Sequence, residues 1–229
     1  GSTISRESDA VILTHAGPEI AVASTKAFTA QVTACYILGL YLAQVRGNKY
    51  ADEIADYMEK LARVPEAIAR VLENGETVRQ FARTMQDATS VIYLGRHVGF
   101  PVALEGALKL KEICYIHAEG YAAGEMKHGP IALIDQTFPT FALALKDELL
   151  PKVVSNIVEI QARQGRVITL TNEGCDVKGD DIWVIPDVGK PLTAFFVLPA
   201  LQLFSYETSD YLGKDVDQPR NLAKSVTVE

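Results

Sequence analysis

The chain has 229 residues, of which 48% are hydrophobic, enough for the packed core of one or two domains. Its formal charge of −7, without a run of lysine or arginine, argues against nucleic-acid binding, because neutralising phosphates needs clustered cations. Apolar stretches such as 32–43 and 194–206 fall short of the roughly 20 residues that span a bilayer, and no signal peptide is visible, so no membrane contact is predicted. Three widely spaced cysteines predict neither a disulfide framework nor a metal site, and they favour a cytoplasmic protein.

The first 74 residues predict the end of one domain and a helical linker. Residues 10–14 form a short β-like run, and Ser24 or Thr25 can cap a helix over 26–45. A single strand and helix leave a sheet edge open, so residues 1–50 are interpreted as the C-terminal part of a domain that begins upstream. Residues 51–74 then predict a linker helix, which Pro65 interrupts.

Strand and helix patterns alternate in the rest of the chain. Strands are expected at 90–94, 139–145, 166–171 and 181–186, and helices at 76–85, 101–114, 148–164 and 193–212. Strands separated by helices of this length predict an α/β fold over 75–212, a parallel sheet sandwiched by helices, with ligands outside the carboxyl ends of its strands. Residues 213–229 show no regular period over their first half and are interpreted as a tail that docks elsewhere.

Ionisable side chains are densest between residues 105 and 130. On a helix at 100° per residue, Glu105, Lys109 and Glu112 fall within about 60° of one another. Glu112 beside Lys109 is a candidate proton-transfer group, although a solvated i, i+3 ion pair explains the spacing equally simply. His128 lies in K-H-G-P, where a helix cannot continue, and is either an acid–base group or a surface loop histidine.

The two ends of the chain hold the other candidates. Lys224 stands in a mostly apolar, uncharged context, where a docked amine could attack a carbonyl, whereas a tail lysine in water is the simpler alternative. Glu19, Val22 and Ser24 precede the helix expected at 26–45, whose N-terminus favours anions. A capping role explains Ser24 almost as well.

Three blocks together closely resemble the glutamine:fructose-6-phosphate amidotransferase (glucosamine-6-phosphate synthase) family. They are G-P-E-I-A-V-A-S-T-K-A-F-T-A-Q at 17–31, A-L-E-G-A-L-K-L-K-E-I-C-Y-I-H-A-E-G-Y-A-A-G-E-M-K-H-G-P at 103–130, and D-Q-P-R-N-L-A-K-S-V-T-V-E at 217–229. The resemblance covers essentially the whole chain. It implies the isomerase part of such an enzyme, with Rossmann-like, three-layer SIS (sugar isomerase) domains: the end of a first one up to residue 50 and a complete second one over 75–212.

The resemblance also implies roles for individual residues. Lys224 would hold open-chain fructose 6-phosphate as a Schiff base, which ammonia then replaces. Glu112 would move a proton between C1 and C2, Lys109 would assist it, and His128 would open the sugar ring, in the family from a neighbouring subunit. The remaining positions match or adjoin the sugar-lining ones: Val22, Ala223, Glu19 and Ser24.

The implied product is glucosamine 6-phosphate, for amino-sugar biosynthesis, without a metal or cofactor. The implied partners are the sugar phosphate, a glutaminase domain that releases ammonia from glutamine, and a second copy in a homodimer. That glutaminase domain and the serine-rich phosphate loop of the first SIS domain are expected to be missing from this stretch. Two alternatives are a phosphosugar isomerase or deglycase on the same fold, and a non-catalytic sugar-phosphate sensor.

Overall fold

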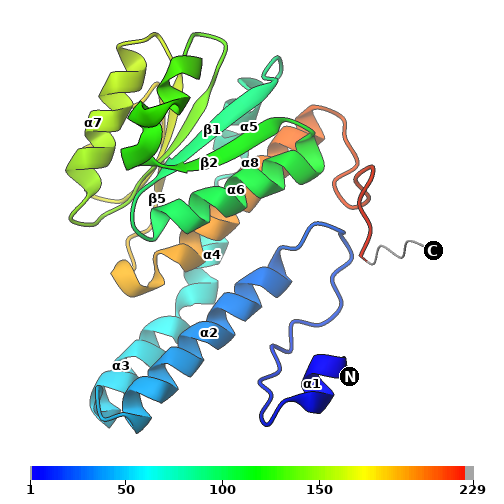
Figure 1. Ribbon diagram of the computed structural model, residues 1–229, viewed down its shortest axis with the longest axis vertical. Coiled ribbons are helices and arrows are strands. Elements are labelled where there is room, and N and C mark those ends of the chain that lie inside the picture. The colour runs from blue at the N-terminus through cyan, green and yellow to red at the C-terminus, as the bar shows by residue number, and fades with distance from the viewer. Residues whose placement is uncertain (1, 225–229) are drawn as a thin grey trace.

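A five-stranded parallel sheet forms the centre of the computed structural model, which describes residues 2–224 (Figure 1). The spatial order is β2-β1-β3-β4-β5. Four of the strands confirm the sequence prediction: β1, β3 and β4 are buried almost throughout between two helical layers, whereas the edge strand β5 buries only alternate residues. The strands are β1 (Ser90–Gly95), β2 (His117–Ala122), β3 (Thr140–Ala144), β4 (Val167–Asn172) and β5 (Asp181–Ile185).

The edge strand β2 was not predicted. Its sequence, H-A-E-G-Y-A, neither alternates nor forms an apolar run, and most of its residues are only half-buried. Pairing with β1 in parallel register, from Ser90 opposite His117 to Gly95 opposite Ala122, makes it a strand. Gly120 lets it lie against helix α6 (Gly99–Cys114), since a β-carbon at that position would come 2.9 Å from the Leu104 backbone.

Helices cover both faces of the sheet, as the α/β prediction required. One face carries α5 (Gly75–Arg83), α6 (Gly99–Cys114) and α8 (Ala194–Tyr211), which share the larger hydrophobic cluster. The other face carries α7 (Leu150–Gln161) and the 3₁₀ helices η1 (Ala123–His128) and η2 (Pro130–Leu133). A last 3₁₀ turn, η3 (Lys190–Leu192), leads into α8.

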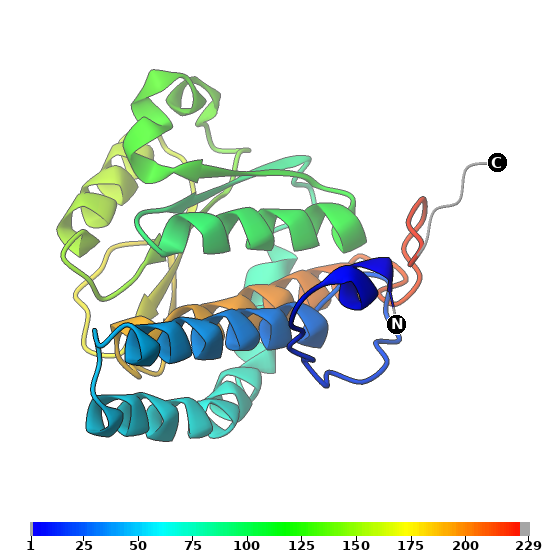
Figure 2. The same cartoon turned by 60° about the horizontal axis from the view of Figure 1, so that its bottom comes forward.

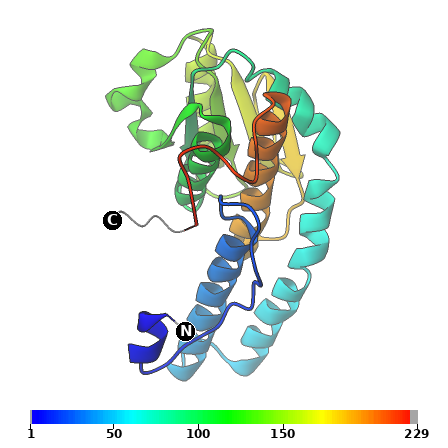
Figure 3. The ribbon, with the colours of Figure 1, turned by 90° about the vertical axis from the view of Figure 1, so that its right-hand side faces the viewer.

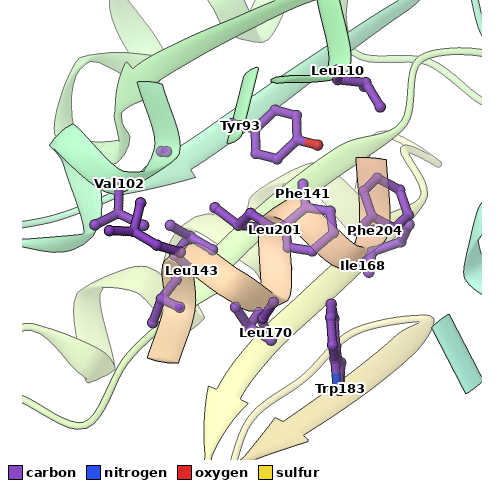
Figure 4. Close-up of a cluster of buried hydrophobic side chains, with 14 of the residues drawn as sticks. Tyr93, Val102, Leu110, Phe141, Leu143, Ile168, Leu170, Trp183, Leu201 and Phe204 are labelled. Atoms are coloured by element: carbon purple, nitrogen blue, oxygen red, sulfur yellow. The ribbon is translucent and has the colours of Figure 1, made fainter. Parts of the chain in front are cut away.

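Aromatic side chains fill the core between the sheet and α8 (Figure 4). Tyr93 of β1 stacks on Phe141 of β3 with ring centroids 5.1 Å apart, and Phe204 of α8 packs on Phe141 at 5.0 Å. Gly106 of α6 permits the close approach of this layer, because a β-carbon there would come 2.7 Å from Leu201 of α8. The core thereby holds α6 rigidly over the sheet.

Three helices lie between the N-terminal segment and α5: α2 (Lys26–Val45), α3 (Ala51–Ala62) and α4 (Val64–Leu72). The predicted α2 is confirmed. The interruption predicted in the linker helix over 51–74 is also found, but at Arg63, two residues before Pro65. Pro65 lies in the first turn of α4, where its missing N–H costs nothing, so it begins a helix instead of interrupting one. Figure 2 shows α2 lying along α8 and α3.

Helix α2 is the one helix among residues 2–224 that is long and apolar enough to cross a bilayer by length and composition alone. The apolar run at 32–43 was too short to predict a helix of bilayer-spanning length. One face of α2 packs against the main core through Phe28, Val32 and Tyr36. The other face of α2, with Tyr41 and Val45, is exposed.

The predicted strand at 10–14 is wrong. After the short helix α1 (Thr3–Glu7), residues 9–20 have no regular structure, and Val11, Ile12 and Leu13 are exposed. A strand exists only with a neighbour to share its hydrogen bonds, and all five strands of the described sheet pair elsewhere.

The tail that follows α8 returns toward the segment before α2 (Figure 3). The backbone N–H of Val22 donates to the carbonyl oxygen of Asp217 at 2.9 Å. This contact joins the two ends of the chain beside α6. The tail therefore contacts the rest of the chain, and the last residues of its motif, 225–229, lie outside the described part.

Candidate functional site

A buried cluster of charges lies on the C-terminal half of α6. The Lys109 ammonium is 2.6 Å from a Glu112 carboxylate oxygen and 3.5 Å from one of Glu105. The exposed fractions of the three side chains are 5% for Lys109, 12% for Glu105 and 22% for Glu112. The alternative of a solvated surface pair is therefore wrong, because one cation is shared by two carboxylates in a largely dry environment.

The environment affects the protonation of this cluster. Burial raises the pKa of Glu105, and the nearby Lys109 charge opposes that rise without cancelling it. Glu112 is the more exposed carboxylate and makes the shorter contact to Lys109. Glu112 is therefore held in one orientation by a fixed cation and still reaches the groove beside it, as a proton-transfer group must.

Lys109 is buried because distant segments cover it. A small cavity of about 70 Å³ is bounded by Lys109 and Ile113 of α6, by the segment before α2, by α8 and by the tail. The other lining residues are Ala21, Ala23, Thr25, Gln202, Tyr206 and Val216. The helix periodicity places Lys109 next to Glu112, but only these other segments remove both from water.

Glu19 organises the segment before α2. Its carboxylate accepts hydrogen bonds from the Thr25 backbone N–H at 2.6 Å, the Thr25 hydroxyl at 2.8 Å and the Ser24 hydroxyl at 3.3 Å. The N-terminus of α2 is thus capped by Glu19, and the predicted cap by the Ser24 or Thr25 side chain is wrong, since the Thr25 side chain makes no capping bond. A carboxylate is favoured there by the helix dipole.

The tail brings Lys224 to this carboxylate. The Lys224 ammonium lies 4.0 Å from a Glu19 oxygen, with the Glu19 side chain 9% exposed and that of Lys224 48% exposed. Burial would raise the pKa of Glu19, but the hydrogen bonds from Thr25 and the Lys224 charge outweigh it and hold the pKa below the ordinary value. The side chain of Lys224 is exposed, as the tail-lysine alternative requires, and its ammonium also lies within ion-pair distance of Glu19.

An open groove of about 490 Å³ connects the tail with the charged face of α6. Glu112 lines it together with Arg220, Asn221 and Leu222 of the tail. Ala223, exposed, precedes Lys224 at the rim, while Val22 contributes its backbone N–H to the bond with Asp217. The sequence-predicted residues of both chain ends and of α6 therefore converge on one region.

His128 does not join this region within the chain. Glu112 lies near the C-terminus of α6, and the chain then runs through all of β2 before reaching η1, which ends at His128. Six strand residues at about 3.3 Å each separate the two ends of β2 by roughly 20 Å. The His128 ring is 71% exposed and contacts Glu125 at 2.7 Å, which also fits the loop-histidine alternative.

Sequence reasoning missed Tyr115, which lines the groove and contacts the tail residue Arg220. Its left-handed backbone (φ 62°) is a tertiary feature with no signal in the sequence, since glycine or asparagine normally marks such a position. Within residues 2–224, no three His, Cys, Asp or Glu side chains are grouped to hold a metal ion.

Comparison with known proteins shows what the chain resembles. Residues 84–181 match the SIS domain family. The chain is 54% identical, over 236 aligned residues, to glutamine–fructose-6-phosphate aminotransferase (isomerizing) of Corynebacterium efficiens, an alignment that covers 100% of this chain and 38% of that protein. The chain thus spans well under half the length of this relative.

Two solved structures extend the comparison. The C-terminal domain of glucosamine-fructose-6-phosphate aminotransferase from Francisella tularensis superposes with a TM-score of 0.88 at 40% identity, covering 93% of this chain and 61% of that one. Glucosamine-6-phosphate deaminase from Thermotoga maritima superposes with a TM-score of 0.68 at 22% identity, covering 99% and 64%. The second likeness concerns the fold alone.

Proposed function

Because this chain contains a SIS domain and is homologous over its whole length to part of glutamine–fructose-6-phosphate aminotransferase, we propose that it is the sugar-converting part of such an enzyme. The proposed reaction is the conversion of fructose 6-phosphate and ammonia to glucosamine 6-phosphate. In the complete enzyme a glutaminase domain supplies the ammonia from glutamine. The observation that carries the proposal is the convergence of Lys224, Glu19 and the Lys109–Glu112 pair on one region.

Lys224 starts the proposed reaction. Its neutral amine attacks the C2 carbonyl of the open-chain sugar, water leaves, and a Schiff base remains. Ammonia then adds to C2 and the lysine amine departs, which leaves the sugar as an imine. Glu19, 4.0 Å from the ammonium, is suited to hold the lysine near the carbonyl and to receive the proton that the amine must lose.

Glu112 completes the proposed reaction. Removing a proton from C1 and returning one to C2 converts the ketose imine to a 2-amino aldose, and one carboxylate can do both in turn. Lys109 fixes the orientation of Glu112 through the 2.6 Å contact and supplies positive charge beside the developing enolamine. Val22, Ser24 and Ala223 border the space in which the sugar would lie.

His128 is assigned to ring opening in a neighbouring copy. The length of β2 separates it from Glu112 of its own chain, and its exposed ring is free to reach a second subunit. The proposal therefore includes a homodimer in which each site takes one histidine from its partner.

Borohydride trapping tests the Schiff base. We expect the chain incubated with fructose 6-phosphate and borohydride to gain the mass of one reduced sugar-phosphate adduct, and Lys224→Ala to gain none. Lys152→Ala, which alters an exposed lysine of α7 on the other face of the sheet, is the matched control and keeps the adduct.

The outcomes separate the candidate functions. An adduct that persists in Lys224→Ala assigns the chemistry to another amine and refutes the site. Binding of fructose 6-phosphate without any adduct supports the sensing alternative. Formation of glucosamine 6-phosphate from ammonium ions, followed by mass spectrometry, distinguishes amination from simple isomerisation.

A further inference from the structure

Tyr115 adopts a backbone conformation that its side chain disfavours. It ends α6 with φ 62° and ψ 24°, in the left-handed region that glycine and asparagine occupy at lower cost. Strain of this kind persists where the surrounding structure demands a particular side chain. The tyrosine side chain should therefore make contacts at this position that glycine could not make.

Its side chain contacts the tail. The backbone N–H of Arg220 donates to the Tyr115 hydroxyl at 2.8 Å, and the Arg220 guanidinium carbon lies 4.2 Å from the centre of the ring. The Lys214 ammonium is 5.9 Å from the same centre. One ring therefore contacts cations from two points of the tail, through interactions that an aliphatic side chain cannot make.

The contacts lie on either side of the other attachment of the tail. Asp217, between Lys214 and Arg220, accepts the hydrogen bond from the Val22 backbone. Asn221, with φ 63°, turns the chain directly after Arg220, and Lys224 follows at the position 4.0 Å from Glu19. Arg220 is thus the last residue with a described attachment before the lysine and its neighbours.

We propose that Tyr115 is a positioning residue, which holds the tail through Arg220 and Lys214 and so places the Lys224 amine at Glu19. This inference rests on the proposed function for the purpose of that placement, but the docking itself does not depend on any reaction. The strained left-handed backbone at the end of α6 is tolerated because it places the Tyr115 ring against the tail.

Limited trypsin digestion tests the docking without substrate. Cleavage after Arg220 requires the guanidinium to leave the Tyr115 ring and enter the protease. We expect Tyr115→Asn to speed cleavage at Arg220 about tenfold, because both the hydrogen bond and the cation–π contacts are lost. Tyr115→Phe, which keeps the ring, is expected to speed it only about threefold.

The choice of asparagine keeps the fold intact. Asparagine adopts the left-handed backbone conformation at lower cost than tyrosine. Tyr115→Asn should therefore retain or raise the midpoint of thermal unfolding while it weakens the attachment of the tail. A general loss of stability would lower that midpoint instead. Tyr50→Asn, at an exposed position at the start of α3, is the matched control and leaves cleavage at Arg220 unchanged.

Borohydride trapping then tests the positioning. We expect Tyr115→Asn to form the Lys224 adduct about tenfold more slowly at saturating fructose 6-phosphate, with little change in the half-saturating sugar concentration, since the ring holds the lysine and not the sugar. Tyr115→Phe should recover most of the rate.

Three results decide the inference. Unchanged cleavage at Arg220 in Tyr115→Asn refutes the docking. Faster cleavage with an unchanged trapping rate refutes the positioning. If the unaltered chain forms no adduct at all, the proposed function and the purpose assigned to Tyr115 fail together, while the digestion still decides whether Tyr115 holds the tail.

Discussion

Lys109 is a single cation shared by two carboxylates in a nearly dry environment. Lys109→Met keeps the aliphatic bulk but leaves Glu105 and Glu112 facing each other without a counter-charge. We expect the free energy of unfolding to fall by about 3–5 kcal/mol at pH 7, because an uncompensated buried charge is costly. Urea unfolding of both proteins measures the difference.

The pH dependence of the Lys109→Met defect has a definite sign. Without the cation, the folded-state pKa of Glu105, which burial already raises, rises further. Protonated carboxyls are then tolerated at acid pH and the penalty grows as pH rises, so the difference from the unaltered protein should shrink toward pH 4. Lys111→Met, on the exposed side of α6, is the control and should change stability by less than about 0.5 kcal/mol. A defect of equal size at pH 4 and pH 7 would contradict the charge argument.

At the scale of elements, β2 packs closely against α6, the helix that carries the site. A β-carbon at Gly120 would lie 2.9 Å from backbone atoms of Leu104. Gly120→Ala must push strand and helix apart, and we expect it to reduce the free energy of unfolding by about 1–3 kcal/mol. Chemical denaturation monitored by circular dichroism gives the value.

Gly39→Ala is the matched control for that prediction. Gly39 lies within α2, and a β-carbon there would meet nothing within 4 Å. Alanine is a better helix former than glycine, so this change should stabilise the protein by about 0.5–1 kcal/mol. If both substitutions shifted stability in the same direction, the close approach of β2 and α6 would not explain the glycine.

At the scale of the whole molecule, Glu19 links the N-terminal segment, α2 and the tail. Its pKa lies below the ordinary value, so its carboxylate stabilises the fold above a pH of about 4.3 and loses that effect as pH falls through the folded-state pKa. We expect Glu19→Gln to lower the free energy of unfolding by about 1 kcal/mol at pH 7. The difference should shrink as pH falls through the folded-state pKa of Glu19, which lies below the ordinary value, because the native carboxylate is then protonated.

Unfolding curves at several pH values test the Glu19 prediction. Glu73→Gln serves as the control, because Glu73 is exposed at the end of α4 and its side chain makes no hydrogen bond or ion pair within residues 2–224. It should leave the pH profile unchanged. A Glu19→Gln defect that stays constant down to pH 3 would mean that the carboxylate charge does not hold these segments together.

The sequence by itself determined the alternating strands and helices, and hence the parallel sheet. Buried central strands have continuous apolar runs, and the helices that cover them have apolar residues at helical spacing. It also identified Glu112, Lys109 and Lys224 as candidates, through residue chemistry and the three motif blocks. These signals are local, so a linear reading can find them. The break between α3 and α4 was predicted at Pro65 and lies at Arg63, because a proline is favoured in the first turn of a helix, just after the break.

Only the tertiary structure decided the features that depend on distant partners. Residues 10–14 look like a strand but have no neighbour to pair with, whereas the polar β2 is a strand because β1 lies beside it. Lys109 is buried because the segment before α2 and the tail cover it, and Tyr115 is strained where it meets Arg220. Burial and pairing arise between residues far apart in the chain, so no local pattern records them.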